Sequence, residues 1–169
     1  MKPIGTNARN WLFTFHILFV AIWIGAALSA NLLLLSNDEM STGDALYTLH
    51  LLIKKLDILI VPSGIGVLLT SILISTLTKW GFIKFKWMIL LWIILLAQII
   101  FGIVVMGPLT ENTLAIAESE GLEALQNLAY SRDAAWLFIA GTLQVLVLAA
   151  GIWIVKFKPW GRREAGQLH

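Results

Sequence analysis

Long runs of apolar residues dominate the chain, and its polar residues gather between them. Four stretches carry almost no charge, at about 11–35, 58–78, 87–107 and 134–155. A bilayer core about 30 Å thick needs about 20 apolar residues to cross it as a helix. Hydrocarbon offers the backbone no hydrogen-bond partner, so each stretch is predicted to be a transmembrane helix. The pattern therefore predicts an all-α fold, an antiparallel bundle of four transmembrane helices.

Composition points to the same class of protein. The 169 residues are 59% hydrophobic and 13% charged, whereas soluble domains carry about 25% charged residues. No repeat, linker or low-complexity segment divides the sequence, so residues 1–169 are predicted to form one membrane domain. The absence of cysteine excludes disulfides, thiolate metal sites and cysteine nucleophiles. A net charge of +2 is too small to indicate a nucleic-acid partner.

Lysine and arginine predict the orientation in the membrane. Nine of the twelve lie in the N-terminal segment, the 79–86 loop or the C-terminal tail, and the other three are Lys54, Lys55 and Arg132. Cytoplasmic segments are enriched in these residues, so both termini are predicted to be cytoplasmic, in a multi-pass protein of the bacterial cytoplasmic (inner) membrane. The tryptophans expected at the interfaces are Trp11, Trp80, Trp87 and Trp160 on the inner side and Trp136 on the outer side.

Two longer connections are predicted on the outer side. Residues 36–56 are acidic at first and then enter the second helix through an extension from about residue 46. Residues 108–133 carry four glutamates with leucines among them. This second segment is predicted to be either a short amphipathic helix that lies on the outer interface or a solvated acidic loop.

Small residues and one proline predict how the helices pack. Pro62 has no amide to donate to the carbonyl of Ile58, so a bend is expected in the outer third of the second helix, as a transport hinge or as a simple kink. Small side chains in the first and fourth helices are expected to allow close backbone approach, within the bundle or in a homodimer. They are Gly25, Ala26, Ala27, Ser29 and Ala30, and Ala140, Gly141, Ala149, Ala150 and Gly151.

His16 is the clearest candidate functional residue, because ionisable groups at membrane depth are rare and costly. It lies five residues after Trp11, roughly 7 Å below the inner interface, and Trp23 follows on nearly the same helix face. A neutral imidazole there suits haem ligation, a proton relay or a structural hydrogen bond to another helix. Lys86 opens the third helix on the same side and is expected either to reach toward His16 or to extend outward to the headgroups.

Four other polar residues are predicted to act mainly in the structure. Asp57 is expected to pair with Arg132, tying the outer ends of the second and fourth helices; the alternative is a carboxylate at the mouth of a cavity. Gln98 and Gln144 lie near mid-membrane. They are expected either to bridge their helices, worth about 1 kcal/mol, or to face a ligand such as a quinone or porphyrin.

The histidines limit the metal chemistry that the chain can support. His16 is inner, His50 is outer and His169 is in the tail, so no bis-histidine haem is predicted. A bound haem b would use His16 as its metal ligand, with a different sixth ligand or none. Met106 and His50 share the outer side but make only a weak metal signal. The sequence contains no nucleotide-binding loop, zinc spacing or hydrolase triad.

Several of these residues together resemble a known pattern. The resemblance is to an uncharacterised family of predicted bacterial four-helix integral membrane proteins, and it covers nearly the whole chain. It rests on the segment from His16 through Trp23 to Gly25, on Asp57, Pro62 and Thr70, on Gln98, and on Lys158-Pro159.

More distantly, His16 with Lys86-Trp87 resembles the membrane protoporphyrinogen oxidases and the membrane domain of copper-resistance proteins. In the oxidases a histidine on the first helix and a lysine on the third are functional, and haem is bound. The resemblance implies that His16 ligates haem and that Lys86 pairs with a porphyrin carboxylate or a proton. The long acidic outer loop departs from that family, as does Gln98, which lies where a second histidine would stand.

Two functions are consistent with the sequence. The first is a membrane component without catalytic apparatus, which binds or transports a small molecule or serves as an accessory subunit of a larger membrane complex. The second is a haem-binding redox protein whose cofactor-binding residues are His16, Lys86, Trp23 and Gln98. The scarcity of catalytic side chains favours the first.

Overall fold

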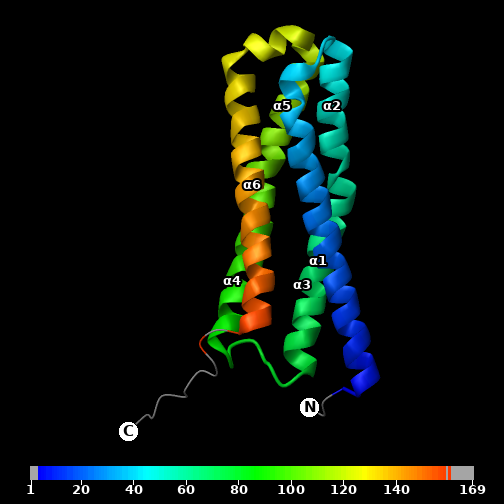
Figure 1. Cartoon of the computed structure of the whole chain (residues 1–169), viewed down its shortest axis with the longest axis vertical. Helices are drawn as coiled ribbons and strands as arrows, with labels where there is room; N and C mark the ends of the chain where they lie inside the picture. Colours follow the sequence, from blue (N-terminus) through cyan, green and yellow to red (C-terminus); the bar gives the residue numbers. More distant parts are fainter. Residues whose placement is uncertain (1–3, 159, 161–169) are drawn as a thin grey trace.

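Four long helical units run side by side along the molecule (Figure 1). The computed structural model describes residues 4–158 and 160; Lys2, Pro159, Arg162, Arg163 and His169 lie outside the described residues. The α-helices of the described part are α1 (Thr6–Leu35), α2 (Gly43–Lys55), α3 (Asp57–Leu77), α4 (Lys86–Phe101), α5 (Gly107–Glu120) and α6 (Leu128–Phe157). A π-helical segment, Gly102–Met106, joins α4 to α5, and short 3-10 helices cover Asn37–Glu39 and Gly121–Gln126.

Each unit is long and apolar enough to cross a membrane. The units are Thr6–Leu35, Gly43–Leu77, Lys86–Gln126 and Leu128–Phe157. The second and third are compound, because α3 follows α2 directly and α4 continues through the π-helical segment into α5. The predicted architecture, four apolar helices packed together, is confirmed.

Capping residues explain why two helices begin where they do. The Thr42 hydroxyl accepts a hydrogen bond from the Ala45 amide at 3.2 Å and starts α2. The Asn127 side-chain oxygen accepts from the amides of Ala129 and Tyr130 at 2.9 and 3.3 Å. Such caps satisfy amides that the first turn leaves unpaired. The cap at Asn127 is why α6 begins six residues before the apolar stretch that predicted it.

The acidic segment after the third apolar stretch is neither a surface helix nor a loop. Its first part is α5, which continues the line of α4 and packs against α2 and α6. The buried face of α5 consists of Thr110, Thr113 and Ala117, small side chains three or four residues apart that let the neighbouring helices approach closely. Both predictions for this segment were therefore wrong, because the buried face is built from small residues rather than from its leucines.

The second unit is interrupted near Pro62 but not at it. The break falls at Leu56, between α2 and α3, and Pro62 is the sixth residue of α3. The carbonyl that loses its partner belongs to Ile58, in the first turn of α3. The Ser63 hydroxyl bonds back to the carbonyl of Leu59 at 2.6 Å.

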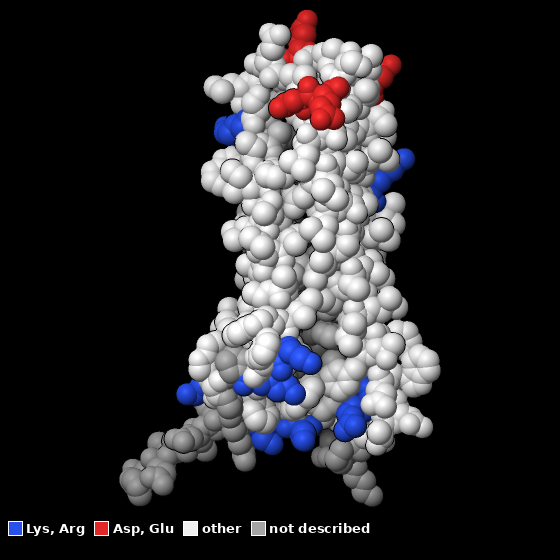
Figure 2. Space-filling view, viewed as in Figure 1, with Lys and Arg blue, Asp and Glu red and all other residues white. Residues whose placement is uncertain are grey.

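Charge divides the molecule into two ends, which we call the acidic end and the basic end (Figure 2). On the face shown, a belt of uncharged side chains separates them, and a few basic side chains lie just below the acidic group. The first and last described segments, before α1 and after α6, both lie at the basic end (Figure 1). The residues that define the acidic end are Asp38, Glu39, Asp44, Glu118, Glu120 and Glu123, and those of the basic end are Arg9, Lys79, Lys84, Lys86, Lys156 and Lys158.

Two glycines allow the tightest helix contacts. A Cβ added at Gly66 of α3 would lie 2.6 Å from the Phe19 ring of α1, and one at Gly141 of α6 would lie 2.5 Å from the Asn31 side-chain oxygen of α1. Close approach through α6 was predicted from its small residues and is confirmed at Gly141. At the basic end, α4 and α6 lie apart from α1 and α3, whereas the helices at the acidic end lie closer together (Figure 1).

Candidate functional site

A cavity of about 980 Å³ lies at the basic end, between α1, α3, α4 and α6. This volume is at the upper end of the roughly 300–1,000 Å³ found for small-molecule sites. Its wall is mostly apolar, and it includes His16 and Trp23, two of the residues predicted to form a cofactor site. Whether these residues form a binding site stays a prediction.

Four tryptophans line the cavity: Trp23, Trp80, Trp87 and Trp92. The rings of Trp80 and Trp87 meet edge to face, with their centroids 5.7 Å apart. Trp87 is only 3% exposed, so its ring packs inside the bundle instead of facing outward.

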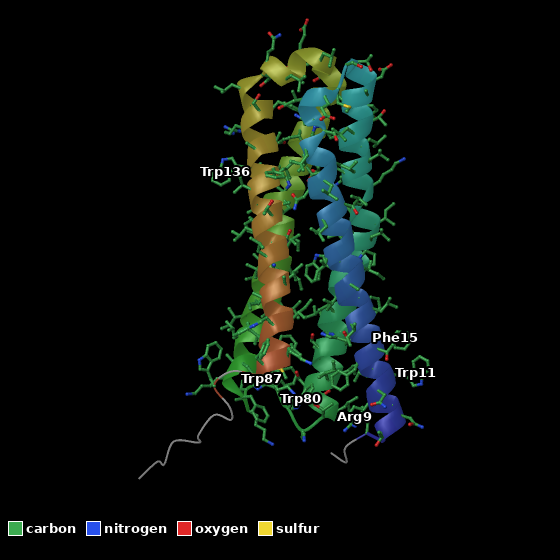
Figure 3. The ribbon with its side chains drawn as sticks, viewed as in Figure 1. Arg9, Trp11, Phe15, Trp80, Trp87 and Trp136 are labelled. Atoms are coloured by element: carbon green, nitrogen blue, oxygen red, sulfur yellow. The ribbon has the colours of Figure 1, made fainter. Side chains whose placement is uncertain are left out.

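Other aromatic side chains do face outward. Figure 3 shows Trp11 and Phe15 pointing away from the bundle on α1, near the basic end, and Trp136 pointing outward from α6 nearer the acidic end. Trp11 is 64% exposed and Trp136 is 56% exposed. Tryptophan is enriched at both membrane interfaces, and these two positions agree with the predicted aromatic belts.

The hydrogen bonds around Thr70 assign the protonation of His16. The Thr70 hydroxyl lies 2.6 Å from the carbonyl of Gly66 and 3.1 Å from that of Val67, so its single proton goes to the backbone. It then accepts the hydrogen bond from His16 Nδ1, at 2.8 Å. A neutral His16 consequently carries its proton on Nδ1, and Nε2 keeps its lone pair. No other described side chain is within hydrogen-bond distance of this imidazole.

Trp23 packs with Val67 and Leu95 in the wall of the cavity. Its ring lies over Gly64 of α3, where an added Cβ would be 3.6 Å from the indole, an ordinary contact distance. Trp23 thus lies on the helix face predicted for it, with His16 nearer the basic end.

Two lysines lie at the basic end of the cavity, and neither is the one predicted. Lys156 and Lys158, from the end of α6, line the cavity. The ammonium of Lys158 sits 5.1 Å from the centre of the Trp80 ring and 6.0 Å from that of Trp87, within the range of cation–π attraction. Lys158 has a left-handed backbone (φ 47°), which ends α6 and turns the chain.

Lys86 has a different position. Its side chain is exposed at the start of α4 and is not part of the cavity wall. The structure therefore does not bring Lys86 to His16. The physical reason is the helix face: the neighbouring Trp87 and Met88 are buried and turn inward, which leaves Lys86 on the outer side.

Gln98 and Gln144 join α4 to α6. The side-chain amide of Gln98 donates to the backbone carbonyl of Gln144 at 2.8 Å, and that of Gln144 donates to the carbonyl of Gln98 at 3.4 Å. Both side chains are buried, and neither lines the cavity. The predicted bridge is present, but each carboxamide bonds to the backbone of the opposite helix rather than to the other carboxamide.

The predicted Asp57–Arg132 ion pair does not form. Asp57 pairs instead with Lys54, one helical turn away, at 3.0 Å, and Lys54 also contacts Glu111 at 3.2 Å. Arg132 pairs with its neighbour Asp133 at 2.8 Å. Each charge has a partner close in sequence or on the adjacent α5, which the prediction did not consider.

A buried polar network at the acidic end was missed by the sequence reasoning. His50 Nε2 lies 2.6 Å from the Tyr130 hydroxyl and 3.1 Å from the Asn37 side-chain oxygen, and the Tyr130 hydroxyl donates to the same oxygen. The network joins α2, α6 and the 3-10 helix after α1. His50 is fully buried. The only feature of the sequence that could have indicated this network is a histidine thirteen residues after Asn37, in the polar segment that follows the first apolar stretch.

These bonds leave little support for a metal at the acidic end. His50 is engaged with Tyr130 and Asn37, and Met106 packs against an apolar cluster that contains Leu34 and Leu137. Within residues 4–158, no three potential ligands of the types His, Cys, Asp or Glu come together. At the other end of the molecule, the wall of the cavity contains the thioether of Met88, which is buried on α4.

No protein-family model, curated protein or solved structure matches the chain. The described residues form a small polytopic membrane protein with a sizeable aromatic cavity at its basic end.

Proposed function

We propose that the chain binds a small molecule in the cavity at the basic end, as a multi-pass membrane protein without catalytic apparatus of its own. The observation that carries the proposal is the composition of the wall. About 980 Å³ is enclosed mainly by apolar and aromatic side chains, and the charged groups of the described wall are Lys156 and Lys158. Such a wall suits an apolar molecule with one acidic group.

Each part of the wall has a role in this binding. The indoles of Trp23 and Trp92 offer flat apolar surface to the body of the ligand. Lys156 and Lys158 pair with its acidic group at the end where the apolar belt gives way to charge. Under the positive-inside rule the basic end faces the cytoplasm, so the acidic group of the ligand lies at the inner interface.

Removing the two lysine charges tests the proposal. The probe is cis-parinarate, a fluorescent polyene carboxylate that accepts excitation energy from tryptophan, titrated into the purified protein in detergent. The double variant Lys156→Gln/Lys158→Gln should bind parinarate about tenfold more weakly, equivalent to about 1.4 kcal/mol, because a charge-assisted contact is lost. The affinity of the same double variant for the uncharged methyl ester of parinarate should fall by less than about twofold.

Lys86→Gln is the matched control, because it removes a lysine from the same end but outside the cavity wall. It should leave the affinity for parinarate unchanged. Energy transfer that is equally strong in all variants, or absent in the wild type, would contradict the proposal. A loss of parinarate affinity in Lys86→Gln alone would instead support the role that the oxidase resemblance implies for that lysine.

Haem is a second candidate ligand, and the His16–Thr70 hydrogen bond is the observation that favours it. A histidine that ligates a metal usually donates its other ring proton to a fixed acceptor, which orients the ring and raises its basicity. His16 would ligate through Nε2, and Lys156 and Lys158 would pair with the propionates. Bound haem would supply one-electron redox chemistry. The residues therefore fit the group.

The absorption spectrum of protein purified from haem-supplemented cells tests this second function. A Soret band and a reduced-minus-oxidised difference spectrum are expected in the wild type, and His16→Ala should abolish both. Thr70→Val removes only the supporting acceptor and should weaken haem affinity by about 10–100-fold. His50→Ala is the control and should keep the band, since His50 lies in the network at the acidic end. A wild type without a Soret band would exclude haem and leave the first function standing.

A further inference from the structure

The wall of the cavity is incomplete between α1 and α6. Ile17 on α1 and Ile152 and Val155 on α6 line the cavity, yet they are 66%, 52% and 42% exposed. A side chain that lines a cavity and is also exposed on the outer surface marks the rim of an opening. Figure 2 shows the surface hollowed on this face, in the half nearer the basic end and beside a group of basic side chains.

Two glycines widen this opening. An added Cβ at Gly25 of α1 would meet nothing within 4 Å, and one at Gly151 of α6 would meet only a Leu91 methyl group at 3.8 Å. Both glycines line the cavity. Within the bundle, close contact between α1 and α6 is made instead at Gly141, nearer the acidic end. The homodimer contact that is also expected of Gly25 and Gly151 stays a prediction.

The opening lies in the apolar part of the bundle. Its rim residues belong to the hydrophobic runs of α1 and α6, and both runs are apolar enough to lie within a bilayer. The described cavity wall has no acidic side chain, and its two lysines follow the rim at the end of α6. An opening of this kind faces lipid along its length and is positively charged at one end.

We propose that the ligand enters the cavity sideways from the lipid, between α1 and α6, and is an anionic amphiphile dissolved in the membrane. This inference rests on the function proposed above and adds the class of ligand and its route. The apolar chain of the amphiphile slides past Gly25 and Gly151 into the space beneath Trp23. Its anionic group stays at the membrane surface beside Lys156 and Lys158. A long-chain carboxylate and an anionic phospholipid share this chemistry.

The test uses the protein reconstituted in vesicles that contain a long-chain carboxylate with a photoactivatable diazirine in its chain. Crosslinked residues are mapped by peptide mass spectrometry. Crosslinks are expected inside the cavity, on Trp23, Leu95 or Leu148. The Cβ of Gly151→Leu would meet only the Leu91 methyl group, at an ordinary 3.8 Å. This variant should lower the yield of cavity crosslinks about tenfold, because the added side chain stands in the path of the ligand.

Ala150→Leu is the matched control. Ala150 is the neighbour of Gly151, is exposed, and lies outside the cavity wall, so the same added volume should leave the yield of cavity crosslinks within about twofold. The lateral route would be overturned by crosslinks confined to the outer faces of the helices. It would also be overturned by equal yields of cavity crosslinks in Gly151→Leu and Ala150→Leu.

The parinarate titration separates the two proposals. If the wild type binds parinarate in a lysine-dependent way but its crosslinks do not respond to Gly151→Leu, the binding function stands and the lateral route fails. If parinarate does not bind, both fail. A phosphatidylglycerol carrying the same diazirine distinguishes the sources: cavity crosslinks from it identify a bilayer lipid as the ligand, and crosslinks from the carboxylate alone identify a free amphiphile.

Discussion

Replacing Gly66 with leucine should separate α1 from α3 and strongly destabilise the protein. A Cβ at this position would lie 2.6–2.7 Å from three atoms of the Phe19 ring, including the Cγ that attaches the ring to its own Cβ. Spinning the ring about its axis does not move Cγ, so relief requires a new Phe19 rotamer or a shift of the helix. Overpacking of this kind costs about 1–3 kcal/mol, and leucine should reach the upper part of that range.

Unfolding in detergent micelles with increasing dodecyl sulfate, followed by helical circular dichroism, measures the effect. Gly66→Ala should lower stability by about 1 kcal/mol, and Gly66→Leu by about 3 kcal/mol. Gly64→Ala is the control, because its Cβ would meet Trp23 at an ordinary 3.6 Å. It should be neutral or stabilising by up to about 1 kcal/mol, since alanine favours a helix more than glycine does. Equal losses at both positions would show that α1 and α3 do not pack as described.

The second large loss of stability is expected from Arg132→Ala. The Asp133 side chain is only 5% exposed, and its partner Arg132 is 63% exposed. Removing the arginine leaves a buried carboxylate unpaired, which costs about 3–5 kcal/mol for a fully buried pair. Because Arg132 is itself largely in solvent, we expect a smaller loss, of about 2 kcal/mol.

The double variant Arg132→Ala/Asp133→Asn decides the cause of that loss. Neutralising the carboxylate should recover more than half of the lost stability, because the unpaired charge is then gone. Lys54→Ala is the comparison at the same end of the bundle. Its pair with Asp57 is exposed on both sides (34% and 40%), so its removal should cost no more than about 1 kcal/mol. An Arg132→Ala protein as stable as the wild type would show that Asp133 needs no partner.

The sequence was a good guide wherever one dominant force decided the structure. The bilayer-length apolar runs predicted four helices, because backbone amides in hydrocarbon must bond within their own segment. Helical spacing placed His16 and Trp23 on one face, and both line the cavity. In these cases a local pattern and a single physical term were sufficient.

Prediction failed where the answer depended on which neighbour was nearest. Lys86 and Lys158 belong to the same basic end, but only helix rotation decides that Lys158 reaches the cavity. Gly25 and Gly66 are the same residue type in apolar helices, yet one borders open space and the other receives an aromatic ring. Asp133 was passed over beside Arg132, although adjacency made it the simplest partner. Such distinctions require the three-dimensional register of the helices, which composition and spacing do not contain.

The buried network at the acidic end has a mechanical consequence for the whole bundle. Asn37, His50 and Tyr130 tie the helices together at that end, and the backbones of Gly43 and Gly121 are so close that an added Cβ at Gly43 would lie 2.9 Å from the Gly121 Cα. Farther along, α6 is also held at Gly141, which lies against Asn31, and at Gln144, which is bonded to Gln98. Any widening between α1 and α6 is therefore confined to the part of α6 from Gln144 to Phe157, about 20 Å of helix. A tilt of about 5° over that length moves the end of α6 by only about 2 Å, so the ties at the acidic end and in mid-bundle limit how far the cavity can open.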